Sequence, residues 1–137
     1  MLRKGDRGRM EGNADMQLEQ VLRALSVIRV AKAAPEESEL HEAVAQALEK
    51  AGLEAKHEAP IAPRCRIDFL CGDIGIEIKK GKTPRARLQS QCARYLASEK
   101  VSALVLVSPM ALYIPPVIGG KKTVVFSLNR LWGVALP

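Results

Sequence analysis

The sequence predicts an α/β domain, because segments with helical and with strand periodicity alternate along its 137 residues. After a first amphipathic helix, the expected order is helix, strand, strand, strand, helix and strand. A chain of this length forms one domain with one core. We expect residues 14–137 to form that domain. Residues 1–13, rich in Arg, Lys and Gly without an apolar pattern, are expected to form a flexible basic tail.

The composition is typical of a globular protein, and the net charge of +6 favours a polyanionic partner. We expect no membrane helix, because the longest apolar region, residues 101–120, is broken by Pro109, Pro115 and Pro116. The three cysteines contain no Cys-x-x-Cys pair, which argues against a disulfide framework, a zinc site or an iron-sulfur cluster. Because the N-terminus also lacks a signal-peptide pattern, we expect a cytoplasmic protein.

Two helices should precede the strands. The first covers about residues 15–32, and the second about residues 35–51, with Pro35 in its first turn and Gly52 after its end. In both, apolar residues recur at helical spacing, so each should turn one stripe toward the core. These stripes are Leu18, Val21, Leu22, Leu25 and Ile28 in the first helix, and Leu40, Val44, Ala47 and Leu48 in the second.

A β-hairpin is predicted around Gly72 and Asp73, a pair suited to a two-residue turn with glycine first. With that turn, Phe69 pairs with Ile76, and Asp68 lies directly opposite Glu77. Side chains alternate between the two faces of a strand, so one face should belong to the core and the other should carry chemistry. The first face holds Ile67, Phe69, Cys71, Ile74, Ile76 and Ile78, and the second holds Arg66, Asp68, Leu70, Gly75, Glu77 and Lys79.

The opposed acids need an explanation, because directly paired residues have Cβ atoms about 5 Å apart and like charges there are destabilising. A divalent cation would offset the repulsion of Asp68 and Glu77, since Mg²⁺ is commonly held by one or two carboxylates. Lys79 points to the same face and would place a positive charge beside a water bound to that ion. The alternative is a solvated face on which acids and bases pair with each other.

A third acid could come from the start of the second helix. Glu37 lies on one edge of the apolar stripe and Glu36 on the opposite edge, so the choice between them stays open. Either acid could instead be present only because it stabilises the helix dipole. His41 follows Glu37 by one turn and would approach the same site, although a partly exposed structural histidine is the simpler interpretation, as it is for His57.

The remaining elements surround the hairpin. Residues 53–61 should form a first strand, at an edge of the sheet because of Pro60. A third helix is expected over about residues 84–98, and residues 101–107 should form a buried strand. Further short apolar segments occur at residues 111–113, 123–127 and 131–134, and their roles stay open.

Two features of this region are relevant to function. Gln91 and Tyr95 lie one turn apart and share a face of the third helix. A basic stretch that includes Lys80, Lys82 and Arg85 stands where the hairpin leads into that helix. Because helix N-termini bind anions, a basic one beside two carboxylates suits a phosphodiester, whereas the alternative is a solvated charged loop.

Together these residues resemble a known family. Asp68 followed after eight residues by Glu77-Ile78-Lys79 resembles the signature of the PD-(D/E)xK nuclease superfamily, whose core has the same helix-strand-strand-strand-helix-strand order. The segment from Gln91 to Tyr95 is similar to the Gln-x-x-x-Tyr motif of a subgroup that includes phage exonucleases and helicase-associated nucleases. Glu37 matches an additional glutamate of many members. The resemblance covers about residues 35–107, and it departs from the pattern in having Ile67 where proline often precedes the aspartate.

The resemblance implies a restriction-endonuclease-like αβββαβ core, with a central mixed sheet flanked by helices, here with an extra N-terminal helix. It also implies a site for Mg²⁺ or Mn²⁺. The implied ligands are Asp68, Glu77, Glu37 and the backbone carbonyl of Ile78. Lys79 would orient or help deprotonate the attacking water, and Gln91 and Tyr95 would position the scissile nucleotide.

The function implied is that of a metal-dependent nuclease that hydrolyses phosphodiester bonds in DNA. Two alternatives remain, namely a nucleic-acid-binding or assembly module of this fold without turnover, and an RNA-directed nuclease. The spare apolar surface of the first helix and of the Trp132 segment favours a homodimer. The basic residues expected to contact nucleic acid are Arg66, Lys80, Lys82, Arg85, Arg87 and Arg94.

Overall fold

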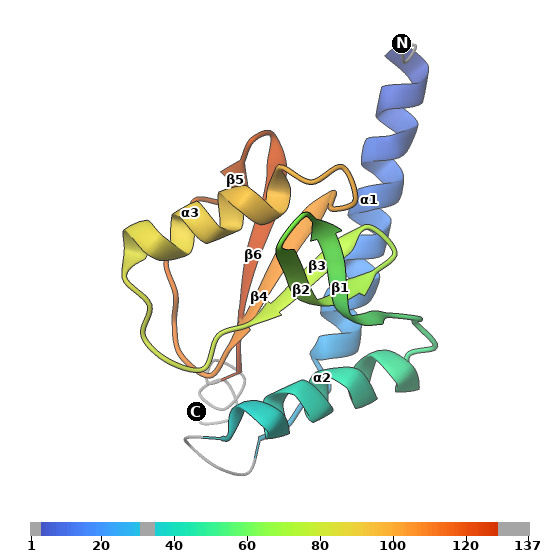
Figure 1. Ribbon diagram of the computed structural model, residues 1–137. Coiled ribbons are helices and arrows are strands. Elements are labelled where there is room, and N and C mark those ends of the chain that lie inside the picture. The colour runs from blue at the N-terminus through green and yellow to red at the C-terminus, as the bar shows by residue number, and fades with distance from the viewer. Residues whose placement is uncertain (1–3, 31–34, 129–137) are drawn as a thin grey trace, which may run out of the picture.

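The computed structural model describes residues 4–30 and 35–128, with side chains from residue 13 onward (Figure 1). The described residues form three helices and one six-stranded mixed sheet, which confirms the predicted α/β class. The elements in order are α1 (Lys4–Leu25), α2 (Glu37–Lys50), β1 (Lys56–Ala62), β2 (Cys65–Cys71), β3 (Ile74–Ile78), α3 (Arg85–Leu96), β4 (Ala103–Ser108), β5 (Val117–Ile118) and β6 (Lys121–Ser127).

The strand order across the sheet is β1-β2-β3-β4-β6-β5. Strands β1, β2 and β3 are antiparallel neighbours, β3, β4 and β6 run parallel, and β5 closes the far edge antiparallel to β6. The predicted order of helix, three strands, helix and strand is therefore confirmed from α2 to β4. As expected, β1 is an edge strand and β4 is buried along its whole length. The hairpin of β5 and β6 was not predicted as such.

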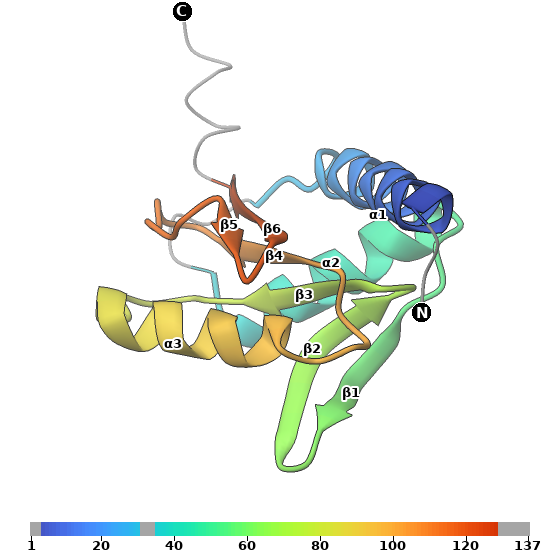
Figure 2. The same ribbon diagram turned by 90° about the horizontal axis from the view of Figure 1, so that it is seen from above.

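Helices cover both faces of the sheet (Figure 2). α1 and α2 lie on one face, and α3 lies on the other. The predicted stripes are correct, because eight of their nine residues are buried and Leu22 is partly buried against the same core. The stripe of α1 thus packs inside the chain, whereas Met16 of the same helix is 62% exposed, and Trp132 lies outside the described residues. The homodimer stays a prediction. None of the helices described is long and apolar enough to cross a membrane.

The first helix begins and ends earlier than predicted. Residues 4–13, which we expected in a tail, form the first turns of α1, and the helix ends at Leu25. Figure 1 shows these first turns extending past the sheet, where there is no core for an apolar stripe to face. Because the prediction depended on such a stripe, it missed this part of the helix. Residues 1–3 and Lys32, the predicted last residue, lie outside the described ranges.

The predicted hairpin register is confirmed where β2 and β3 pair. Phe69 pairs with Ile76, Leu70 with Gly75 and Cys71 with Ile74. The turn uses glycine as expected, because Gly72 has a φ of +59°.

The predicted division into a core face and a chemical face is wrong, because α3 covers the second face. Leu70 is buried against α3, whereas its neighbour Phe69 packs with α1 and α2. Ile67 was expected beside Phe69 but packs on the α3 side, where its Cδ1 would lie 2.6 Å from a Cβ at Gly75. Only glycine leaves room for this contact. Because Ile67 belongs to the core cluster on the α3 side and Ile78 to the cluster on the side of α1 and α2, the two do not share a face.

Strand β2 therefore changes faces at Asp68, and β1 changes faces beside it. His57 pairs with Phe69 and contacts its ring, at 4.7 Å between centroids, whereas Ala59 pairs with Ile67 on the α3 side. Glu58 stands between them with a φ of +49°, a left-handed conformation that costs a non-glycine residue free energy. In Figure 2, β1 and β2 turn away from the line of β3. This switch brings Glu58 and Asp68 to the bend of the two-stranded ribbon.

The C-terminal hairpin is tied to the end of α3. Lys121 Nζ donates hydrogen bonds to the carbonyls of Leu96 at 2.8 Å, Ser98 at 3.0 Å and Val101 at 2.7 Å. Leu96 is the last residue of α3, so this ammonium satisfies one helix-end carbonyl and also binds the carbonyls of Ser98 and Val101 in the segment that follows. Of the segments whose role was open, residues 123–127 belong to β6, residues 111–113 form no helix or strand, and residues 131–134 lie outside the described residues.

Candidate active site

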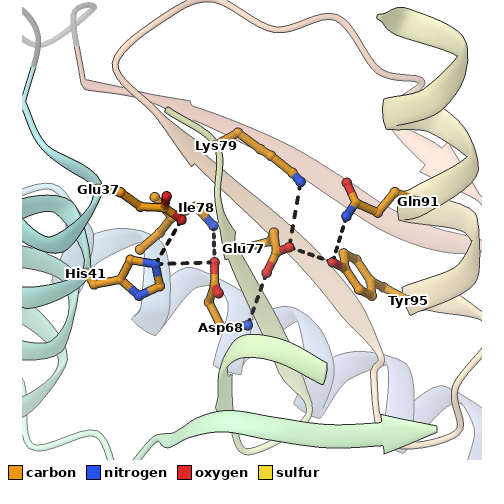
Figure 3. A network of polar contacts seen from close by, with 8 residues as sticks. All are labelled: Glu37, His41, Asp68, Glu77, Ile78, Lys79, Gln91 and Tyr95. Carbon is orange, nitrogen blue, oxygen red and sulfur yellow. Dashed lines mark hydrogen bonds and ion pairs between the residues drawn. The ribbon is translucent and has the colours of Figure 1, made fainter. Parts of the chain in front are cut away.

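The predicted acids meet where β2 and β3 stop pairing, between α2 and α3 (Figure 3). Figure 3 shows Asp68 and Glu77 in the centre, with Glu37 and His41 on the α2 side and Gln91 and Tyr95 on the α3 side. Asp68 is partly buried and Glu77 is 7% exposed. The sheet thus places two carboxylates inside the molecule, where each requires partners.

The two acids are held by backbone N–H groups. The N–H of Asp68 donates to Glu77 Oε1 at 3.1 Å, and the N–H of Ile78 donates to Asp68 Oδ2 at 2.8 Å. Carboxylates thus accept these hydrogen bonds beyond the last recorded pair of β2 and β3, Phe69 with Ile76. Hydrogen bonds to a carboxylate favour its charged form and fix its orientation.

On the α3 side, a chain of hydrogen bonds ends at Glu77. The Tyr95 hydroxyl donates to Glu77 Oε2 at 2.5 Å, and Gln91 Nε2 donates to the Tyr95 oxygen at 3.1 Å. Lys79 Nζ stands 3.8 Å from the same Glu77 Oε2. The prediction that Gln91 and Tyr95 share a face is correct, and in the structure both support Glu77.

On the α2 side, His41 lies between two acids. Its Nε2 is 3.8 Å from Asp68 Oδ2 and 3.6 Å from Glu37 Oε1. Glu36, the other candidate for the third acid, points elsewhere and pairs with Lys80 at 3.4 Å. The structure therefore places Glu37, and not Glu36, at the edge of the site, although the Glu37 side chain is 65% exposed.

The described residues fit a divalent cation, but with a different set of ligands from the one expected. His41, Glu58 and Asp68 each offer one ligand atom within 4.8 Å of the other two. Ligands of one such ion stand about 2.0–2.2 Å from it, so a small adjustment would bring all three into contact with a single ion. Among the residues described, Glu37, Asp68 and Glu77 do not form such a set. Ile78 contributes its N–H here, to Asp68.

Burial changes the acidity of the groups on the α3 side. It raises the pKa of the Glu77 carboxyl to about 7; the Tyr95 hydrogen bond opposes this rise and the charge of Asp68 adds to it. Burial and the bond to Glu77 also raise the pKa of Tyr95, which keeps this hydroxyl a donor. Burial raises the pKa of Cys92 to about 11, so this thiol is not a nucleophile at neutral pH. All three cysteines are free and buried.

The predicted basic contacts lie on the surface around this site. Lys82, Arg85, Arg87 and Arg94 are exposed, and Lys80 pairs with Glu36. Arg66 is also exposed and donates from Nη1 to the backbone oxygen of Glu58 at 3.2 Å. Most of this charge follows the loop after β3 and the exposed side of α3.

Sequence reasoning missed Glu58 and gave His41 a structural role. Glu58 reaches the site only because β1 bends there with a positive φ, and no residue in its segment signals such a bend. For His41 a signal existed, since it follows Glu37 by one helical turn.

No family model matches the chain, and neither a curated protein nor a solved structure does.

Proposed function

We propose that the chain is a metal-dependent nuclease that hydrolyses phosphodiester bonds in DNA. The observation that carries this proposal is that Asp68, Glu77 and Lys79 belong to one polar network on two adjacent strands, at the point where their pairing stops. One buried and one partly buried carboxylate, with an ammonium 3.8 Å from the buried one, suit a reaction in which a cation and a proton acceptor act on a phosphate ester.

The fold supports the same proposal. From α2 to β4 the elements follow the order of the PD-(D/E)xK nuclease core, and Gln91 and Tyr95 stand on the helix where the Gln-x-x-x-Tyr subgroup carries them. We therefore assign the chain a restriction-endonuclease-like core with an added N-terminal helix.

The cation would be Mg²⁺ or Mn²⁺, held by Asp68 together with His41 and Glu58, and bordered by Glu37 and Glu77. When bound, such an ion supplies a Lewis acid and lowers the pKa of a nearby water. The imidazole favours Mn²⁺ over Mg²⁺, because nitrogen ligands suit transition metals while Mg²⁺ prefers oxygen alone.

The other residues orient the reacting groups. Lys79, whose side chain is 17% exposed, would hold the attacking water and balance charge that develops on the phosphate. Tyr95 and Gln91 keep Glu77 in one orientation, and the exposed basic loop after β3 would bind the flanking phosphates.

A second candidate is a nucleic-acid-binding module of this fold without turnover. It is favoured by the protein contacts of Glu77, whose two carboxylate oxygens both accept hydrogen bonds and whose pKa is raised to about 7. A carboxyl occupied by these two contacts would support the helix and the strand without assisting a cation.

A cleavage assay separates the two. The protein is incubated with linear, nicked, branched and single-stranded DNA and with RNA, each in Mg²⁺, Mn²⁺ or EDTA. We expect cleavage of DNA that EDTA abolishes. Cleavage of RNA alone would reject the DNA nuclease and support an RNA-directed nuclease. Binding without cleavage in either metal would reject both nucleases and support the binding module.

Asp68→Ala tests the site, with Asp73→Ala in the exposed hairpin turn as the matched control. We expect the first variant to lose cleavage and to bind Mn²⁺ more weakly, and the second to keep both. Equal activity in the two variants would show that the site lies elsewhere.

A further inference from the structure

A hollow beside the start of α3 lies outside the acid network. Its volume is about 260 Å³, a size for one ring system rather than for a drug-sized ligand. The loop after β4 forms one wall, with Met110, Leu112 and Tyr113, and the basic segment and α3 form the other, with Lys82, Arg85 and Leu88.

Tyr113 is the distinctive residue of this hollow. It is 71% exposed, the highest exposed fraction among the large hydrophobic side chains that are exposed in the described part of the chain. The Arg85 guanidinium lies 5.7 Å from the centroid of its ring, a cation–π contact that holds one ring face toward a cation. An exposed ring beside arginine and lysine is the combination on which proteins stack the bases of a single strand.

The charge of the hollow selects among occupants. Its described lining contains two cations, Lys82 and Arg85, and no carboxylate. An apolar peptide would gain nothing from these charges, whereas the phosphates that flank a stacked base would meet both.

We infer that Tyr113 is a base-stacking subsite for single-stranded nucleic acid, with Lys82 and Arg85 contacting the adjacent phosphates. This inference rests on the proposed function and specifies its substrate as a strand with unpaired bases near the site. Tyr95 and Arg85 lie ten residues apart on α3, about 15 Å along the helix axis. The stacked base would therefore lie several nucleotides along the strand from Glu77.

The test measures binding without cleavage, in EDTA, by anisotropy of a labelled 12-nucleotide adenine strand. The controls are an abasic strand with the same number of phosphates and a blunt duplex. We expect Tyr113→Ala to weaken binding of the adenine strand by about 5- to 150-fold, the range for one stacked base. Tyr113→Phe should stay within about twofold, because phenylalanine keeps the ring. Binding of the abasic strand and of the duplex should change by less than about twofold.

The salt dependence of the binding affinity distinguishes the contribution of the Tyr113 ring from that of the two cations. Tyr113→Ala should lower the affinity without changing the slope of log affinity against log salt, since stacking releases no counterion. Lys82→Ala should lower that slope by about 0.7, the value for one phosphate contact on a single strand. Val117→Ala, at an exposed residue outside the hollow, and Lys50→Ala, an exposed lysine of α2, are the matched controls and should match the parent protein.

The outcomes distinguish the subsite from the nuclease. Equal binding of adenine and abasic strands by the parent protein, or an unchanged affinity in Tyr113→Ala, would overturn the subsite even if the protein cleaves DNA. Loss of binding in Tyr113→Ala by a protein that cleaves nothing would support the subsite and reject the nuclease. Absence of any binding to nucleic acid would overturn both.

Discussion

The hydroxyl of Tyr95 donates a hydrogen bond of 2.5 Å to Glu77 Oε2, and it joins α3 to the most buried acid of the site. This bond lowers the pKa of Glu77, against the stronger effect of burial. Removal of the hydroxyl should therefore raise that pKa further above about 7.

We expect Tyr95→Phe to shift the pH dependence of Mn²⁺ binding toward higher pH, because a proton on Glu77 competes with the cation nearby. Calorimetric titrations of Mn²⁺ between pH 6 and 9 measure the shift. Tyr113→Phe makes the same chemical change on an exposed ring and should leave the profile unchanged. Identical profiles for all three proteins would show that the hydroxyl does not control Glu77.

Without metal, the stability of the protein should depend on the protonation of Glu77. This carboxyl titrates near 4.5 in the unfolded chain and at about 7 in the folded one, so between these values the folded state holds the additional proton. Its contribution is complete below pH 4.5 and is lost as the pH rises to about 7. The free energy of unfolding should fall by up to about 1.4 kcal/mol per pH unit in this window.

Urea unfolding in EDTA at pH 5, 6, 7 and 8 tests this dependence. Glu77→Gln cannot ionise and should be less sensitive to pH over the same range. If the variant and the parent protein lose stability equally as the pH rises, another group is responsible.

The two histidines offer a comparison within one environment, because both rings contact Phe69, at 5.8 Å for His41 and 4.7 Å for His57. Only His41 belongs to the set of ligand atoms with Glu58 and Asp68. We expect His41→Ala to weaken Mn²⁺ binding by about tenfold or more, and His57→Ala to change it by less than about twofold. Calorimetry measures both, and an equal loss in the two variants would point to Phe69 packing instead of ligation.

Substitution of two neighbouring lysines, Lys79 and Lys80, should distinguish a catalytic role from a general contribution of positive charge to DNA binding. Lys79 stands 3.8 Å from Glu77 with a side chain 17% exposed, whereas the Lys80 side chain is 42% exposed and pairs with Glu36. Lys79→Ala should reduce the cleavage rate by about 100-fold or more while metal and DNA binding persist. Lys80→Ala should affect the cleavage rate much less and weaken DNA binding slightly. Single-turnover rates at saturating protein measure the difference, and normal cleavage by Lys79→Ala would remove this residue from the mechanism.

Substitutions of the adjacent residues Lys121 and Lys122 should differ in their effect on the stability of the protein. Lys121 Nζ serves three carbonyls at the end of α3, and Lys122 forms a surface ion pair with Asp15 at 2.9 Å. Lys121→Met should cost about 2–3 kcal/mol of unfolding free energy, because it leaves the carbonyls of Leu96 and Val101 without their side-chain donor. Lys122→Met should cost less than about 1 kcal/mol. Urea melts of both variants give the values, and a similar cost for the two would contradict the assigned role of Lys121.

Local signals allowed much of the site to be predicted from sequence. The Gly72-Asp73 turn determined the pairing of Phe69 with Ile76, and helical spacing alone placed Gln91 beside Tyr95. These predictions succeeded because each depends on a few neighbouring residues with one strongly preferred geometry.

The predictions that were wrong concern features that depend on contacts between distant segments of the chain. The face change at Asp68 requires room for Ile67 over Gly75 and a left-handed Glu58 on another strand, none of which alternation of apolar residues reveals. Lys121 reads as part of a basic loop, and only the folded chain shows its ammonium beneath α3. The proximity of Asp68 and Glu77 was therefore predicted, whereas Glu58 was not predicted and a structural role was preferred for His41.

The bend at Glu58 and Asp68 has a mechanical consequence. Of the three residues that could hold an ion, Glu58 and Asp68 lie on the bent ribbon of β1 and β2, and His41 lies on helix α2, which packs in the core. A movement of the ribbon would change the distances from the Glu58 and Asp68 carboxylates to the His41 imidazole. A bound ion would therefore link the ribbon to the helix. A nucleic-acid strand that displaces the ribbon would then change the affinity of the site for the ion.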